Sequence, residues 1–154
     1  MEELLEYRSR LIGRFAGQTE DLRLAIERFS QEALHLPLEP GGWTPHQVLA
    51  HVRDVEIQAF RPRMQRILEH DHPTLEYFDE QAWMSKQYDS GEPMAALLAA
   101  FAKARESNPV LVKELPSQDW NRLAFHPHWG HRTLQWWVEY AVAHTDEHLD
   151  QLGA

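Results

Sequence analysis

The sequence contains no cysteine among its 154 residues. This absence excludes disulfide bonds, thiolate metal sites, iron–sulfur clusters and a cysteine nucleophile. Ten histidines are present, so imidazole is the metal ligand that the composition favours. Any thiol chemistry would require a small-molecule thiol from outside the chain.

Long apolar runs and an excess of positive charge are missing as well. The longest apolar run, MAALLAAFA (Met94 to Ala102), is far shorter than the ~20 residues of a membrane span. The formal net charge is -9 at pH 7, whereas nucleic-acid binding draws on clustered Lys and Arg. Arg61, Arg63 and Arg66 are interpreted as a solvated helix face. We expect a cytoplasmic protein that binds neither membranes nor nucleic acid.

Four helices are predicted from apolar periodicity and from helix boundary signals. The first runs from Glu2 to about Phe29, and the second from Pro45 to about His70. Thr44, Pro45 and Gln47 supply an N-cap, a first-turn proline and a capping box for the second helix. The third begins near Pro93 and is kinked or ended by Pro109. The fourth lies between Thr133 as N-cap and Gly153 as C-terminal glycine.

A long crossover, DHPTLEYFDEQAWMSKQYDSGE (Asp71 to Glu92), separates the second and third helices. Such a connection is typical of a bundle whose neighbouring helices run parallel, and we expect one short helical turn within it. No convincing strand pattern is found. The fold class predicted is all-α, a four-helix bundle forming a single domain over residues 1–154.

Two histidines, His144 and His148, lie four residues apart in the last helix. Residues at this spacing project from one helix face, and this face also carries Trp137 and Tyr140, which indicates that it points into the bundle. His51 lies on an apolar stripe of the second helix. Alone it is best interpreted as a core histidine bonded to a carbonyl, but the three together predict a metal site with an open coordination position.

Other motifs are weaker. The sequence HTDEH lacks the glutamate that follows the first histidine in H-E-x-x-H, so a zincin-type protease is excluded. His126, His128 and His131 precede the last helix and are interpreted as pocket-rim or structural residues, with surface metal binding as the alternative. Asp54, one turn beyond His51, is the best candidate for a carboxylate that orients an imidazole. The other acidic candidates are Glu56, Asp146 and Glu147.

The segments GGWTPHQVLAHVRDVE and GHRTLQWWVEYAVAHTDEHLDQL resemble the DinB/YfiT-like family of metal-dependent enzymes. In that family a histidine follows a Trp-containing helix start and H-x-x-x-H ends the domain. The resemblance covers nearly the whole chain, including YFDEQAW and HPHWGHRT. It implies a DinB-like bundle, frequently a homodimer, with a divalent metal held by His51, His144 and His148.

The resemblance also implies a reaction type. Members of the family are associated with thiol-dependent transfer using bacillithiol, mycothiol or glutathione, and some are described as hydrolases. Our first hypothesis is a thiol S-transferase acting on a small molecule, because three neutral imidazoles leave the positive charge of the ion free to stabilise a thiolate. The alternatives are a hydrolase that uses metal-bound water, with Asp54 or Glu147 as base, and a non-catalytic stress-response module. Three imidazoles accommodate Zn, Ni, Fe or Mn.

Overall fold

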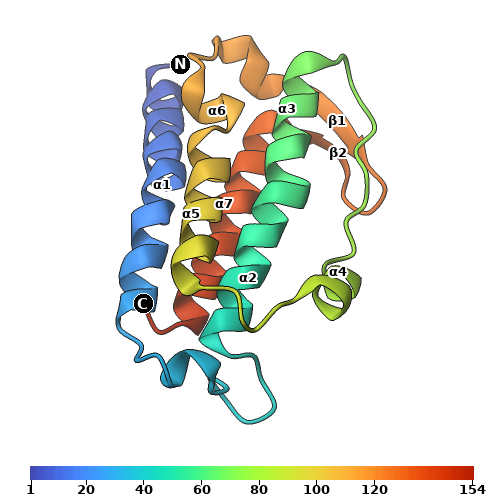
Figure 1. Cartoon of the computed structure of the whole chain (residues 1–154). Helices are drawn as coiled ribbons and strands as arrows, with labels where there is room; N and C mark the ends of the chain where they lie inside the picture. Colours follow the sequence, from blue (N-terminus) through green and yellow to red (C-terminus); the bar gives the residue numbers. More distant parts are fainter.

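The computed structural model describes residues 1–154 and shows a bundle of four long helical segments (Figure 1). Their bounds are α1 (Glu2–Glu27), α2 (Pro45–Val55) continued by η2 (Glu56–Phe60) and α3 (Arg61–Glu69), α5 (Met94–Glu106), and α7 (Leu134–Gln151). The shorter elements are η1 (Ala33–His35), α4 (Glu80–Gln87), α6 (Pro109–Val112), η3 (Ser117–Asn121), β1 (Leu123–His126) and β2 (Gly130–Thr133). No helix combines the length and the apolar character needed to cross a bilayer.

The long helices pack as two parallel pairs, which confirms the predicted bundle with a crossover. α1 contacts α7, and both run from the top to the bottom of Figure 1. α2 contacts α5, and both run upward. The crossover therefore has to return along the length of the bundle, and the predicted helical turn within it is α4.

The helix boundaries agree with the capping signals in the sequence. The Thr44 hydroxyl accepts a hydrogen bond from the Gln47 backbone N–H at 3.1 Å, and the Gln47 side chain accepts one from the Thr44 N–H at 2.9 Å. Thr133 caps α7 by accepting from the Trp136 N–H at 3.1 Å. Gly153 has a φ of 83°, the left-handed conformation common just after a helix C-terminus.

The second predicted helix contains a turn of π-helix, η2, immediately before α3. Pro62 has no backbone N–H, and its ring crowds the carbonyl four residues earlier. A local widening from α-helical to π-helical hydrogen bonding accommodates such a residue without breaking the helix. The sequence predicted a bend at Pro62, and the structure shows how the chain continues through it.

The third helix ends at Glu106, before Pro109, which agrees with one of the two expected alternatives; Asn108 caps a separate short helix, α6, that begins at Pro109. One element differs from the expectations. A small antiparallel hairpin, β1 with β2, precedes α7, although no strand was expected. Gly130 closes its turn with a φ of 74°, which side chains larger than glycine's adopt only with strain. The hairpin is too short to produce a clear alternation in the sequence.

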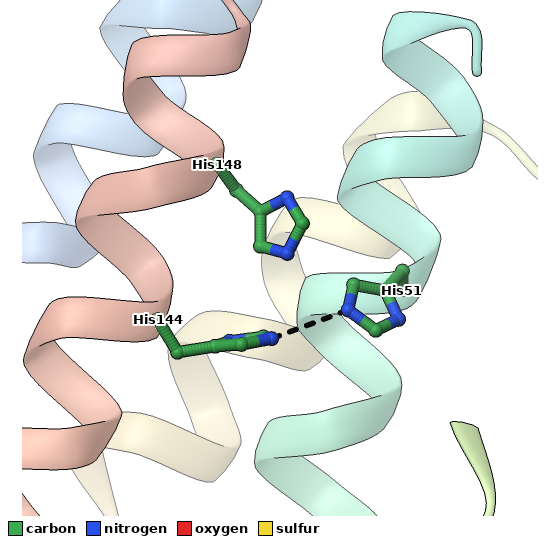
Figure 2. A group of neighbouring side chains, drawn as sticks. All are labelled: His51, His144 and His148. Carbon is green, nitrogen blue, oxygen red and sulfur yellow. Dashed lines mark hydrogen bonds between the residues drawn. The ribbon is translucent and has the colours of Figure 1, made fainter. Parts of the chain in front are cut away.

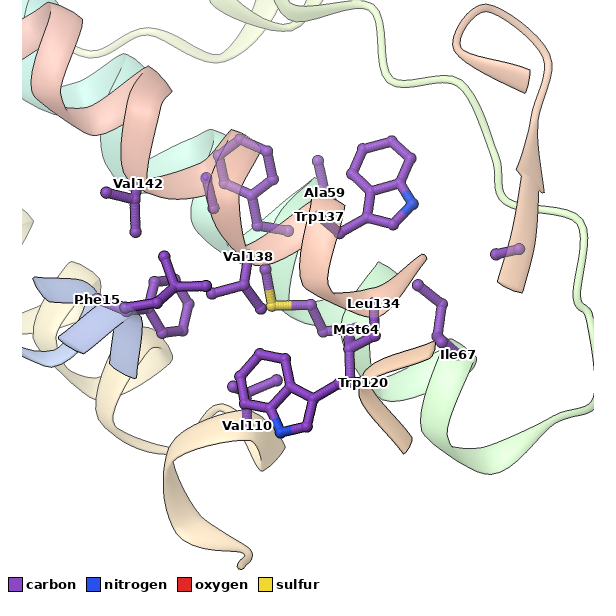
Figure 3. Close-up of a cluster of buried hydrophobic side chains, with 14 of the residues drawn as sticks. Phe15, Ala59, Met64, Ile67, Val110, Trp120, Leu134, Trp137, Val138 and Val142 are labelled. Carbon is purple, nitrogen blue, oxygen red and sulfur yellow. The ribbon is translucent and has the colours of Figure 1, made fainter. Parts of the chain in front are cut away.

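The core is mostly apolar and contains one ion pair in which both side chains are almost fully buried. Side chains from α1, the second helical segment and α7 form the cluster in Figure 3, including Phe15, Met64 and Trp137. The α5 side chains Leu97 and Phe101 belong to a second buried cluster. Among them lies Arg105, whose guanidinium is 2.8 Å from Glu56 and also donates to the Thr145 hydroxyl at 3.3 Å. This pair connects α5 to the π-helical turn and to the residue that follows His144.

Candidate metal site and adjoining cavity

Three imidazoles from two helices meet inside the bundle (Figure 2). His51 comes from α2, and His144 and His148 come from successive turns of α7. One ring nitrogen of each lies within 4.8 Å of the others. The Nε2 atoms of His51 and His144 are 3.2 Å apart. The structure thus brings together the three residues that the sequence selected.

The donor set fits a divalent ion. Two nitrogens that each lie ~2.0 to 2.1 Å from one ion are themselves separated by about 2.9 to 3.4 Å, and 3.2 Å falls in that range. The Nδ1 atom of His148 lies 2.8 Å from the Gln151 side-chain oxygen. That bond places the proton of His148 on Nδ1 and leaves Nε2 as a lone-pair donor, the arrangement common in metal-binding histidines.

Burial keeps the imidazoles in the neutral form that a metal requires. It lowers the pKa of His51 to about 4, and the neighbouring His148 acts in the same direction. It lowers the pKa of His144 to about 3, with further contributions from His148, His51 and Arg105. Both rings are therefore uncharged lone-pair donors at neutral pH.

Aromatic residues enclose two of the three rings. Trp43 contacts the edge of His51 with ring centroids 5.1 Å apart, and Phe60 contacts His144 in the same way at 5.4 Å. Phe60 is the last residue of the π-helical turn. These contacts hold the rings in place and reduce access of solvent on one side of the cluster.

The carboxylate closest to the cluster is Glu80, which the sequence analysis did not select. Its Oε2 atom lies 3.3 Å from Nε2 of His51. Burial raises the pKa of Glu80, Arg63 lowers it, and Asp79 raises it further. Glu80 is the first residue of α4 in the crossover, and only the return of that segment along the bundle brings it to His51. No local sequence pattern could have signalled this contact.

The acidic residues chosen from the sequence have other partners or none. Asp54 accepts a hydrogen bond from the Arg53 Nε atom at 2.6 Å. Glu56 is the buried partner of Arg105. Asp146 pairs with Arg14 and Gln18 on α1, and Glu147 is exposed. The role of Asp54 as a residue that orients His51 remains a prediction.

A cavity of about 230 Å³ adjoins the cluster. It lies between the second helical segment, the crossover, the hairpin and α7, and Phe60 and Glu80 line it. Arg63 lines it too and is only 9% exposed, so the interpretation of Arg63 as part of a solvated face is wrong. The helix turns this side chain against Trp137, with the guanidinium carbon 5.0 Å from the ring centroid.

The hairpin histidines differ in their surroundings. His126 is 1% exposed and lines the cavity. Its Nδ1 accepts hydrogen bonds from the backbone N–H groups of His128 and Trp129, at 3.0 and 3.2 Å. Burial lowers the pKa of His126 to about 4, with Arg63 and His128 acting in the same direction. His131 instead contacts His72 on the surface at 2.8 Å.

Comparisons with known proteins find one superfamily and several relatives. The family model of the DinB superfamily matches residues 14–152. YfiT of Bacillus subtilis, named as a candidate metal-dependent hydrolase, is 26% identical over 106 residues, which are 69% of this chain and 59% of that protein. A protein of Oceanobacillus iheyensis named in the same way is 24% identical over 143 residues, 90% of this chain and 82% of that one. The sequence alignment thus covers less than two thirds of the length of YfiT.

A solved structure has the same fold. The structure of YfiT from Bacillus subtilis, described as an unusual four-helix bundle topology, matches with a TM-score of 0.86 at 23% sequence identity. The match covers 96% of this chain and 85% of that chain. It confirms the fold class that the sequence predicted.

Proposed function

Because the chain belongs to the DinB superfamily, we propose that it is a metal-dependent enzyme that hydrolyses a small molecule at the three-histidine site. The observation that carries this proposal is the meeting of His51, His144 and His148 next to the carboxylate of Glu80. The relatives named as candidate metal-dependent hydrolases support the same class of function.

The protein's own groups have distinct roles in this proposal. A divalent ion bound by the three imidazoles would act as a Lewis acid and lower the pKa of an attacking water toward ~7. Glu80 would accept the proton of that water on Oε2, and the burial that raises its pKa makes it a stronger base. Trp43 and Phe60 would limit the approach of further water from their side.

Thiol-dependent transfer is the second candidate, and it would use the same residues. The chain has no cysteine, so bacillithiol, mycothiol or glutathione would supply the thiol, and Glu80 would accept its proton. The sequence alone favoured this reaction because the charge of the ion was expected to be uncompensated. Glu80 beside His51 offsets part of that charge, which weakens the electrostatic preference for any bound anion, thiolate or hydroxide. We rank hydrolysis first because the relatives are named as candidate hydrolases.

A substrate panel separates these functions. Metal-loaded protein would be assayed with esters, amides and lactones, and separately with an electrophile in the presence of each thiol. Hydrolysis without thiol that stops on chelation supports the first proposal, and turnover that requires a thiol supports the second. If neither occurs while chelation lowers the melting temperature, the metal is structural and the third hypothesis, a non-catalytic module, holds.

We also propose that the chain forms one domain and associates as a homodimer in the cytoplasm. The family resemblance supports this assembly. Light scattering after size exclusion gives the mass directly. A value near the 18.1 kDa of one chain would contradict the dimer.

A further inference from the structure

Buried hydrogen-bond donors that have no acceptor gather at the cavity beside the histidines. Arg63 forms no salt bridge, its Nε lacks a partner, and one terminal N–H reaches the Glu76 carbonyl at 3.5 Å. The Nδ1 of His126 accepts two backbone N–H groups, so its proton lies on Nε2, which is buried and unpartnered. The indole N–H of Trp137, a ring in contact with both, is also unpartnered.

Burying these donors without acceptors costs folding free energy, unless a ligand supplies the missing acceptors. Arg63 attracts Glu80 from a distance, but no carboxylate forms a salt bridge with its guanidinium, so most of the hydration lost on burial is not replaced. A buried N–H without an acceptor adds its own desolvation cost. Both costs disappear when one acceptor-rich anion enters the cavity that Arg63 and His126 line.

We propose that this cavity binds a carboxylate group of the substrate, with Arg63 and His126 as its donors. This assignment deepens the proposed function, on which it depends for the identity of the ligand as a substrate. The remaining walls, which include Val55, Phe60, Phe78 and Trp129, would surround an apolar or aromatic body. The volume of about 230 Å³ lies below the range typical of drug-sized ligands, so the substrate is compact.

The charges around the cavity favour a carboxylate over a phosphate. Arg63 supplies one positive charge and His126 a neutral N–H donor, while Asp79 and Glu80 also line the cavity. A planar, singly charged group matches the guanidinium and its neighbour. A doubly charged phosphate would leave one charge unbalanced against two nearby carboxylates.

The location of the cavity connects carboxylate binding to the proposed chemistry. Phe60 and Glu80 line the cavity, and these same residues contact His144 and His51. A substrate anchored by its carboxylate at Arg63 would therefore extend its opposite end toward the three imidazoles. Arg63 and His126 are positioned to select the substrate, and the histidines with Glu80 to act on it.

The test uses benzoate, the neutral isostere benzamide and the dianion phenylphosphonate as probes of the full-length protein. Each is titrated into metal-free and metal-loaded samples while two-dimensional NMR follows the indole and backbone N–H signals. We expect benzoate to shift the signals of Trp129 and its neighbours in both samples, and to bind at least tenfold more tightly than the other two probes. Binding to metal-free protein separates this site from coordination of benzoate to the ion.

Variants test which side chain causes the preference for benzoate. Arg63→Met should remove the preference for benzoate over benzamide, Arg63→Lys should retain part of it, and Arg66→Met, one turn away and outside the cavity, should leave it unchanged. If Arg63→Met does not fold, the comparison of probes on the wild type and on Arg63→Lys decides. Equal affinities for benzoate and benzamide, or tighter binding of phenylphosphonate, overturn the proposal. Loss of the metal site with retained benzoate selectivity would instead overturn the proposed function alone.

Discussion

At the scale of the residue, Glu80 is the carboxylate placed to transfer a proton at the cluster, since its Oε2 lies 3.3 Å from His51. Asp54, one helical turn from His51, is held by Arg53. The two residues therefore offer a matched comparison. Asp54 is buried and Glu80 half-buried, and only Glu80 contacts the imidazole.

We predict that Glu80→Gln lowers kcat/KM by about 10²- to 10⁴-fold, the usual contribution of a general base. The amide preserves the shape of the side chain but cannot accept the proton. Asp54→Asn should lower kcat/KM by about 10- to 100-fold if Asp54 orients His51 without transferring a proton. The rates are measured on the best substrate from the panel, with metal content checked in each variant. A larger loss of kcat/KM in Asp54→Asn than in Glu80→Gln would show that Asp54, and not Glu80, is the general base.

Protonation of His126 makes the free energy of unfolding depend on pH. The pKa of His126 is about 4 in the folded protein and about 6.5 in an unfolded chain. Between these values the unfolded state binds a proton that the folded state does not, so stability falls as the pH falls from about 6.5 to 4. We predict that His126→Gln reduces this slope by up to about 1.4 kcal/mol per pH unit, measured by urea unfolding. An unchanged slope in the variant would contradict a buried neutral His126.

At the scale of the element, the helices could be predicted because their signals are local. Thr44, Thr133 and Gly153 act within one turn of the helix ends that they define. The β1–β2 hairpin was not predicted because strands of four residues contain too few alternations of apolar and polar residues to be recognised. The burial of Arg63 was not predicted either, because the crossover and the hairpin that cover it are distant from Arg63 in the sequence.

Two glycines, one in the hairpin turn and one inside α1, test the backbone conformation of these elements. Gly130 has a φ of 74° in the hairpin turn, so Gly130→Ala should cost about 1 to 2 kcal/mol. Gly13 lies within α1 with nothing within 4 Å of an added Cβ, so Gly13→Ala should stabilise by about 0.5 to 1 kcal/mol. Denaturant unfolding of both variants measures these changes. Equal effects would show that the hairpin turn tolerates a side chain.

The buried ion pair of Arg105 and Glu56 should contribute to the free energy of unfolding, because it connects α5 to η2. We predict that Arg105→Met destabilises by about 3 to 5 kcal/mol, because it leaves Glu56 charged and buried. Adding Glu56→Leu should recover part of that loss. Arg23→Met, which removes exposed ion pairs on α1, is the control and should change stability little, because solvent screens ion pairs between exposed side chains. A double variant no more stable than Arg105→Met would contradict this account.

At the scale of the whole molecule, the sequence predicted the ligands of the proposed site better than its surroundings. The four-residue spacing of His144 and His148 fixes their common face, and the apolar neighbours of His51 indicate that it points inward. Glu80 and the donors of the cavity depend on how the crossover and hairpin close over the bundle. That closure results from packing between distant segments, which no local pattern encodes.

The bundle should fold without metal and gain stability from it. Two apolar clusters fill its interior independently of the histidines. An ion that binds only the folded state, at a concentration about 100-fold above its Kd, should raise the melting temperature by about 5 to 10 °C. Calorimetry of chelated and reloaded protein checks this value. A chelated protein that is unfolded at 25 °C would contradict it.

The central claim is that one divalent ion is held by His51, His144 and His148. Its most direct test is elemental analysis of tag-free protein, in the wild type and in His51→Ala, His144→Ala and His148→Ala, with His131→Ala as a surface control. We expect about one ion per chain in the wild type and in His131→Ala, and a large loss in each of the other three variants. Full metal content in His51→Ala and His148→Ala would contradict it.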